Sequence, residues 1–137
     1  MFSILDVPAY GNCLFEAVGR SVGIEASQLR KDACAFMENG SNTLHGEKIT
    51  DWIAWNAEAP YETYIREMKR DGTWGGGIEL AILATLLEKA IVVYEKSGKR
   101  IAEFLPDKKD NLGAIMILWV HKMHYMQIVY HPSSSSS

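Results

Sequence analysis

Residues 10–18 read Tyr-Gly-Asn-Cys-Leu-Phe-Glu-Ala-Val, so a turn-forming Gly-Asn pair runs directly into Cys13. After the cysteine, Leu14, Ala17 and Val18 share one helical stripe, which predicts an amphipathic helix beginning at Cys13. A thiol in the first turn of a helix faces unpaired backbone N–H groups and the positive end of the helix dipole, and both favour the thiolate. Cys13 is therefore a candidate nucleophile. The alternative is a small apolar side chain buried in the core.

The length and composition indicate one soluble domain. The chain has 137 residues, of which 47% are hydrophobic and 23% charged. We expect a single domain over residues 1–131 and a disordered serine-rich tail over residues 132–137. The net charge of −3 argues against a nucleic-acid partner. No signal-peptide pattern and no apolar run near the length of a membrane span is present, so we expect a cytoplasmic monomer with no membrane partner.

The cysteines and glycines give no sign of a metal or cofactor. Cys13 and Cys34 form no CxxC pair, and no ligand pair has metal spacing, so a metal-binding protein is a poor interpretation and we expect no cofactor. Residues 75–77 are three glycines, but they match neither a P-loop nor a dinucleotide-binding pattern. We interpret them as glycines that let a loop pass close to another element.

The first half of the chain has helical periodicity. An extended segment is predicted over residues 2–7, followed by helices over 13–23, 27–39, around 49–53, from Pro60 onward, and over 78–88. Ser27 is the predicted N-cap of the second helix, and Asn39-Gly40 its end. Residues 41–46 are polar and predicted to be a loop.

The second half changes to strand periodicity. Strands are predicted over residues 90–94, 101–105, 113–120 and 125–130, with a hairpin turn at Ser97-Gly98. The expected fold class is α+β, with a helical N-terminal half packed on a mainly antiparallel sheet from the C-terminal half. Val92, Ile117 and Ile128 should then lie on strands.

A nucleophilic thiolate needs a histidine within hydrogen-bond reach, and separation along the sequence is no obstacle. His45 and His131 lie in polar segments and are most simply surface residues, whereas His121 and His124 border the final strand turn. A histidine at the start of a strand can be held rigidly against a neighbouring helix. His124 is therefore the candidate partner of Cys13, and the alternative is a structural or surface histidine.

Four motifs occur in order along the chain: Gly11-Asn12-Cys13-Leu14-Phe15, Trp74-Gly75-Gly76-x-x-Glu79-Leu80, Ile91-Val92-Val93-Tyr94 and His124-Tyr125. Together they resemble the ovarian-tumour (OTU) family of papain-like cysteine proteases, over about residues 6–130. The resemblance implies a papain-like OTU domain with deubiquitinase activity. Such an enzyme hydrolyses the isopeptide or peptide bond after the C-terminal glycine of ubiquitin or a ubiquitin-like modifier. The implied partners are ubiquitin or polyubiquitin chains.

The resemblance also implies roles for individual residues. Cys13 would be the nucleophile and His124 the general base, and the loop of Tyr10, Gly11 and Asn12 would form the oxyanion hole. For Asn12, shaping the turn is the role that its residue type favours. The resemblance further implies that the substrate is the C-terminal tail of ubiquitin, which is rich in arginine and glycine. A narrow groove floored by glycines and carrying a few carboxylates would bind such a tail.

Two positions depart from the family pattern. The family has an aspartate three residues before the cysteine, where this chain has Tyr10, and an aspartate or asparagine two residues after the histidine, where it has Met126. The residue that orients the histidine is therefore missing from its ordinary places. Asp6, upstream of the cysteine, is our candidate replacement, and its alternative is a solvated aspartate. Gln127 should point to the opposite sheet face from Met126.

The glycine-rich motif has two interpretations. Trp74, Gly75 and Gly76 could line a substrate channel, or Trp74 could be an aromatic plug in the core beside a tight turn, which the sequence alone favours. Glu79 is predicted to be a structural hydrogen-bond partner near the start of its helix. The alternative function, which the departures at Tyr10 and Met126 favour, is a catalytically impaired OTU-like module that binds ubiquitin without cleaving it.

Overall fold

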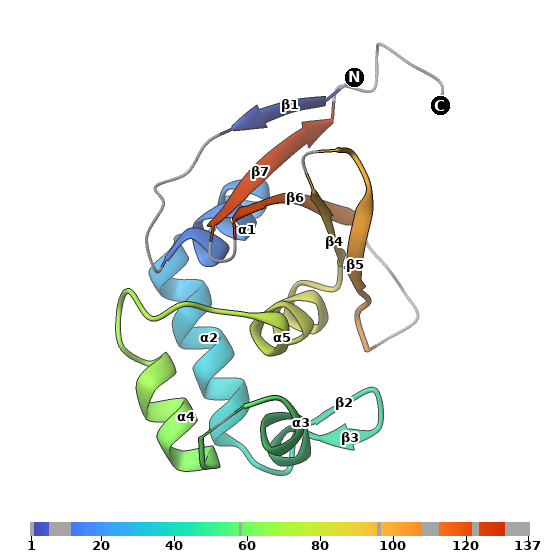
Figure 1. The fold of residues 1–137 in the computed structure, drawn as a ribbon. Coiled ribbons are helices and arrows are strands. Elements are labelled where there is room, and N and C mark those ends of the chain that lie inside the picture. Colours follow the sequence, from blue (N-terminus) through green and yellow to red (C-terminus); the bar gives the residue numbers. More distant parts are fainter. Residues whose placement is uncertain are drawn as a thin grey trace.

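The computed structural model describes residues 2–5, 12–57, 59–95, 97–107, 113–121 and 124–130, and gives only the backbone of residues 2–5, 119–121 and 124–130. The elements, in chain order, are β1 (Phe2–Leu5), α1 (Cys13–Val22), α2 (Ala26–Glu38), β2 (Thr43–Leu44), β3 (Glu47–Lys48), α3 (Ile49–Asn56), α4 (Tyr61–Met68), α5 (Gly77–Leu87), β4 (Ala90–Glu95), β5 (Arg100–Phe104), β6 (Ala114–His121) and β7 (His124–Tyr130) (Figure 1).

The main sheet has five strands in the order β1-β7-β6-β4-β5. Val92, Ile117 and Ile128 lie on β4, β6 and β7, so the α+β prediction is confirmed. Three of the four strand pairs are antiparallel, while β4 and β6 run parallel. The N-terminal strand β1 also joins the sheet by pairing with β7, so one edge strand of the sheet comes from outside the C-terminal half.

The central helix α5 lies between the sheet and helices α2 and α3 (Figure 1). It contacts α2, α3, β2, β4 and β5, and Ile82, Leu83 and Ala84 are completely buried. The part of the helix from Ile78 to Ala84 is buried on every face and can be apolar around its whole circumference, whereas Leu86 in the last turn is 42% exposed. It begins one residue earlier than predicted, with Gly76 as N-cap, and ends at Glu88 in a left-handed conformation. No helix in the described part of the chain is long and apolar enough to cross a membrane.

Two local predictions between α1 and α3 are wrong. Helix α2 begins at Ala26, because Glu25 is the N-cap and its carbonyl accepts from the N–H groups of Gln28 and Leu29; Ser27 lies inside the first turn. Residues 41–46 are not only a loop, since β2 within them pairs with β3 in a short hairpin. Leu44 anchors this hairpin: its side chain is buried and its carbonyl accepts a 3.0 Å hydrogen bond from Trp52 Nε1.

Helix α1 places the start of the candidate site between the sheet and α2. It packs against β7, β6 and α2. Its buried residues include Leu14, Ala17 and Val18, as its periodicity predicts. It ends at Gly23, whose φ of 73° is left-handed and suits a glycine at this position.

Candidate active site

Cys13 is the first residue of α1, which confirms the helix start predicted from its sequence. The backbone N–H groups of this first turn have no hydrogen-bond acceptor within the helix, because an acceptor carbonyl would have to lie four residues earlier. These groups and the helix dipole favour a negative charge at the thiol. Cys13 is completely buried in this structure.

The residue before the cysteine, Asn12, is bonded through its side chain to two other segments. Its Oδ1 accepts hydrogen bonds from Arg30 Nη2 at 2.6 Å and from the Gly72 N–H at 3.2 Å. Its Nδ2 donates to Asp71 Oδ1 at 3.0 Å. The side chain makes no capping hydrogen bond to α1, since it faces the loop that follows α4. These hydrogen bonds connect Asn12 to α2 and to the loop after α4, and they leave the first turn of the helix uncapped by that side chain; the predicted role of Asn12 in the turn stays a prediction.

The loop between α4 and α5 passes directly beside the start of α1. A Cβ added at Gly75 would lie 3.2 Å from the Phe15 ring and 3.5 Å from Leu14, so glycine permits this close approach. Trp74 is 38% exposed, so the prediction of an aromatic core plug is wrong. The loop packs against the start of α1 through Gly75 instead of through its tryptophan, and the Gly72 N–H bonds to Asn12.

The side chain of Glu79 bonds to the last part of this loop, at Gly76. It is completely buried, and its Oε1 accepts a 2.7 Å hydrogen bond from the Gly76 N–H, while Oε2 accepts one of 2.6 Å from Tyr64 Oη. The predicted structural role near the helix start is therefore confirmed. Burial raises the pKa of the Glu79 carboxyl, opposed by these two hydrogen bonds and by the charge of Arg30.

The raised pKa of Glu79 predicts a pH-dependent effect of Glu79→Gln. A carboxyl whose pKa is higher in the folded state contributes stability that is complete below its unfolded pKa and is lost as the pH rises through the folded value. Glutamine keeps an acceptor for the Gly76 N–H but does not ionise. We therefore expect the stability of the variant relative to the parent to increase from about pH 4 to pH 8. Urea unfolding across this range measures it, and a constant difference would contradict it.

His124 begins β7, the strand that packs against α1 (Figure 1). The backbone of His124 pairs with His121 of β6, beside an irregularity in the register. The structure thus brings the strand that starts with the candidate base onto the helix that starts with the candidate nucleophile. Asp6, Tyr10 and Gly11 lie outside the described residues, so their proposed roles stay predictions.

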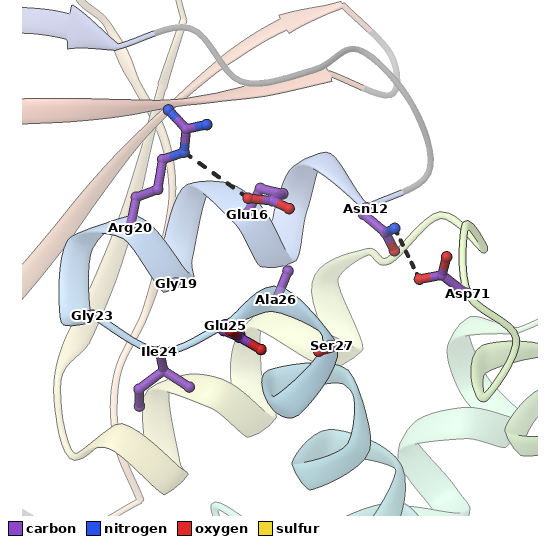
Figure 2. A pocket seen from close by; sticks show the side chains of 10 residues that line it. All are labelled: Asn12, Glu16, Gly19, Arg20, Gly23, Ile24, Glu25, Ala26, Ser27 and Asp71. Carbon is purple, nitrogen blue, oxygen red and sulfur yellow. Dashed lines mark hydrogen bonds and ion pairs between the residues drawn. The ribbon is translucent and has the colours of Figure 1, made fainter.

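An open groove of about 610 Å³ extends from the nucleophile turn along α1 to the start of α2 (Figure 2). Asn12 and Asp71 line one end, and Gly19 and Gly23 lie along it. Further carboxylates come from Glu16, which is 4.0 Å from Arg20, and from Glu25. The lining of this groove therefore combines two glycines with the carboxylates of Glu16, Glu25 and Asp71.

The second cysteine lies in a different environment. Cys34 is buried within α2, and burial raises the pKa of its thiol to about 11. It also lacks the first-turn position of Cys13. We expect iodoacetamide at pH 7 to modify Cys13 faster than Cys34 in the folded protein, because the thiolate is the reacting form. Peptide mapping by mass spectrometry measures both rates, and faster modification of Cys34 would contradict the assignment.

Two residues of the site were missed by the sequence interpretation, Arg30 and Asp71. Arg30 occupies the buried face of α2, one turn before Cys34. A signal was present, since an arginine three residues before Ala33 and four before Cys34 falls on the apolar stripe of the helix. Asp71 carried no comparable signal, because aspartate before glycine is common in turns. Among the described residues, no group of three or more His, Cys, Asp or Glu side chains is placed to hold a metal ion.

In this fold a cysteine is the first residue of a helix that packs against the main sheet. The OTU-like cysteine protease family matches residues 8–129, and the chain belongs to this family. It is 26% identical over 147 residues to OVARIAN TUMOR DOMAIN-containing deubiquitinating enzyme 4 of Arabidopsis thaliana, covering 98% of this chain and 45% of that protein. The chain therefore spans less than half the length of this relative.

Solved structures show the same fold. The OTU domain of OTUD1 superimposes with a TM-score of 0.75 at 20% identity, covering 94% of this chain and 86% of that one. An OTU domain in complex with ubiquitin gives a TM-score of 0.73 at 21% identity, covering 93% of this chain and 69% of that one.

Proposed function

We propose that this protein is a cysteine-dependent deubiquitinase that cleaves the bond after the C-terminal glycine of ubiquitin or of a ubiquitin-like modifier. The observation that carries the proposal is the position of Cys13 as the first residue of α1, on which the strand that begins with His124 packs. Membership of the OTU-like cysteine protease family supports it. The names of related proteins, which include deubiquitinating enzymes and ubiquitin thioesterases, support the substrate class.

The proposed reaction is acyl transfer in two steps. The Cys13 thiolate attacks the carbonyl carbon of the C-terminal glycine, and the loop of residues 10–12 stabilises the oxyanion. The tetrahedral species then collapses: the C–N bond breaks, and the His124 imidazolium donates its proton to the departing amine. In the second step His124 removes a proton from water, hydroxide adds to the thioester, and the free carboxylate and the Cys13 thiolate are released.

A ubiquitin probe with an electrophile at its C-terminus tests the proposal. We expect the folded protein to form a covalent adduct, visible as a mass increase of one probe and mapped to Cys13. The Cys13→Ala variant should form none. Ubiquitin without the electrophile should compete with the probe, because the same surface binds both. An intact protein that forms no adduct, or one modified at Cys34, would overturn the proposed activity.

The alternative function, a module that binds ubiquitin without cleaving it, is favoured by Tyr10 and Met126 at the places where the family has its acidic residues. The two functions differ in one result. A binding module would retain ubiquitin in a pull-down and form no adduct, whereas the enzyme would retain ubiquitin and also form the adduct. A thiolate–imidazolium pair can exist without a third residue, so the departures favour slower turnover over none.

The third residue of the site gives a kinetic prediction. If Asp6 orients His124, we expect Asp6→Asn to lower kcat by well over tenfold with little change in ubiquitin binding, since the interaction stabilises the transition state. For scale, loss of the orienting aspartate in a chymotrypsin-type triad costs about 10⁴ in kcat. Met126→Asp, which restores the family residue, should recover part of the rate.

Steady-state assays on the two single variants and on the double variant decide this assignment. An Asp6→Asn enzyme as fast as the parent would remove Asp6 from the site, leaving a Cys13–His124 dyad.

A further inference from the structure

The guanidinium of Arg30 joins three segments that are distant in sequence. Its Nη2 donates to Asn12 Oδ1 at 2.6 Å and to the Thr73 carbonyl at 2.7 Å. Its Nη1 donates to the Met68 carbonyl at 2.9 Å. One side chain on α2 therefore binds the residue before the nucleophile, the end of α4 and the loop that leads to Trp74.

This cation is buried at the centre of the site. Arg30 is 3% exposed, and its guanidinium carbon lies 4.5 Å from the centroid of the Phe15 ring. Phe15 is also the side chain that Gly75 approaches closely. Burial lowers the pKa of Arg30, with Asp71 acting in the opposite direction, but an arginine stays charged at neutral pH. Burying a charge is costly, so such a group persists where its hydrogen bonds hold a specific geometry.

We propose that Arg30 is a positioning residue for the reaction of Cys13: it clamps the Asn12 turn and the loop of residues 71–75 in one fixed arrangement at the start of α1. The inference rests on the proposed function in that Cys13 is the nucleophile. Asn12 is adjacent to Cys13, so a shift of its side chain moves the first turn of the helix. Small displacements of reacting groups lower rates strongly, by up to about 10²-fold for 1 Å.

The geometry requires an arginine. The acceptors on Asn12, Met68 and Thr73 are served by two nitrogens of one planar group, whose fork fixes the direction of each bond. A lysine would keep the positive charge but has a single nitrogen at the end of a flexible chain. Arg30→Lys therefore separates the clamp from the charge.

The test compares Arg30→Met, Arg30→Lys, Asn12→Ala and the Arg30→Met/Asn12→Ala double variant with the parent. The control is Ile53→Ala, which creates a cavity at a completely buried site on α3 and destabilises the fold without touching the clamp. All are assayed below their melting temperatures with a fluorogenic C-terminal amide of ubiquitin and, separately, by the rate of iodoacetamide modification of Cys13.

We expect Arg30→Met to lower kcat at least tenfold with little change in KM. Arg30→Lys should also lower kcat, by more than half as much as Arg30→Met does, because the charge alone does not replace the clamp. Asn12→Ala should lower kcat as well, and the double variant should be no slower than Arg30→Met, because both substitutions break the same clamp. Ile53→Ala should keep the parent's kcat. If Arg30→Met does not fold, the Lys and Asn12→Ala variants carry the comparison.

Three results would overturn the inference: a folded Arg30→Met or Arg30→Lys enzyme with the parent's kcat, independent losses that multiply in the double variant, or an equal loss in Ile53→Ala. Failure of the proposed function is distinguishable from these. In that case the parent does not cleave the ubiquitin amide, yet the iodoacetamide rate at Cys13 still reports whether Arg30 positions the thiol.

Discussion

Cys13→Ala is expected to abolish hydrolysis of ubiquitin C-terminal amides, with kcat lowered by at least about 10⁴-fold. The physical reason is that the acyl-enzyme cannot form without the sulfur, and water then has to attack the carbonyl directly. Loss of a nucleophile differs from loss of a positioning group, since it removes the covalent step itself. Initial rates with a fluorogenic ubiquitin amide measure the effect.

The matched control for this prediction is Cys34→Ala. Cys34 is buried, as Cys13 is, and Cys34→Ala likewise removes one sulfur atom. Cys34 lies within α2, however, and the pKa of its thiol is raised to about 11. We expect Cys34→Ala to keep the parent's kcat. Both variants should show the circular dichroism spectrum of the parent. Retained hydrolysis in Cys13→Ala would mean that another group performs the attack.

Gly19→Ala is expected to destabilise the protein by about 2 kcal/mol or more, although alanine is the better helix former. Gly19 lies inside α1, where replacing glycine ordinarily stabilises a helix by roughly 0.5–1 kcal/mol. Here an added Cβ would lie 2.3 Å from the backbone carbonyl oxygen of Ile24. That carbonyl belongs to the connection between α1 and α2, so relieving the clash requires the backbone itself to move.

The hydrogen bonds of the same turn increase the expected cost. The Gly19 carbonyl accepts from the N–H groups of Gly23 at 2.8 Å and Ile24 at 3.1 Å, so moving Ile24 breaks the end of the helix. Gly77→Ala is the matched control, because the Cβ there would make only ordinary contacts of 3.8 Å with Phe104. Urea unfolding of both variants tests the contrast. A Gly19→Ala protein as stable as the parent would contradict it.

The local elements were predictable where the signal is local. The start of α1 at Cys13 and the strands around Val92 and Ile117 follow from hydrophobic periodicity, which depends on neighbouring residues. The start of α2 was not predicted correctly, since Ser27 is a favoured N-cap residue and Glu25 is not. The β2–β3 hairpin was missed because burial of Leu44 by α3 and α5, which no local pattern records, stabilises a strand of two residues.

For the site, the order of motifs along the chain was enough to single out Cys13, His124 and the glycine-rich loop. It was not enough to place Trp74, which its residue type assigns to the core and which the structure leaves partly exposed. The reason is that the loop contacts Phe15 through Gly75 and not through the tryptophan. Whether a large side chain packs inward depends on the shape of the surface opposite, which is formed by a distant segment.

The sequence by itself determined the family, the candidate nucleophile and base, and most of the helices and strands, because these depend on residue identity and short-range periodicity. Only the tertiary structure showed that Arg30 joins Asn12, Met68 and Thr73, that Asn12 faces Asp71, and that Gly19 has no room for a Cβ. These contacts join residues up to 59 positions apart. They exist because burial of the apolar faces of α1, α2 and α5 brings separate segments within hydrogen-bond distance, which no local sequence pattern encodes.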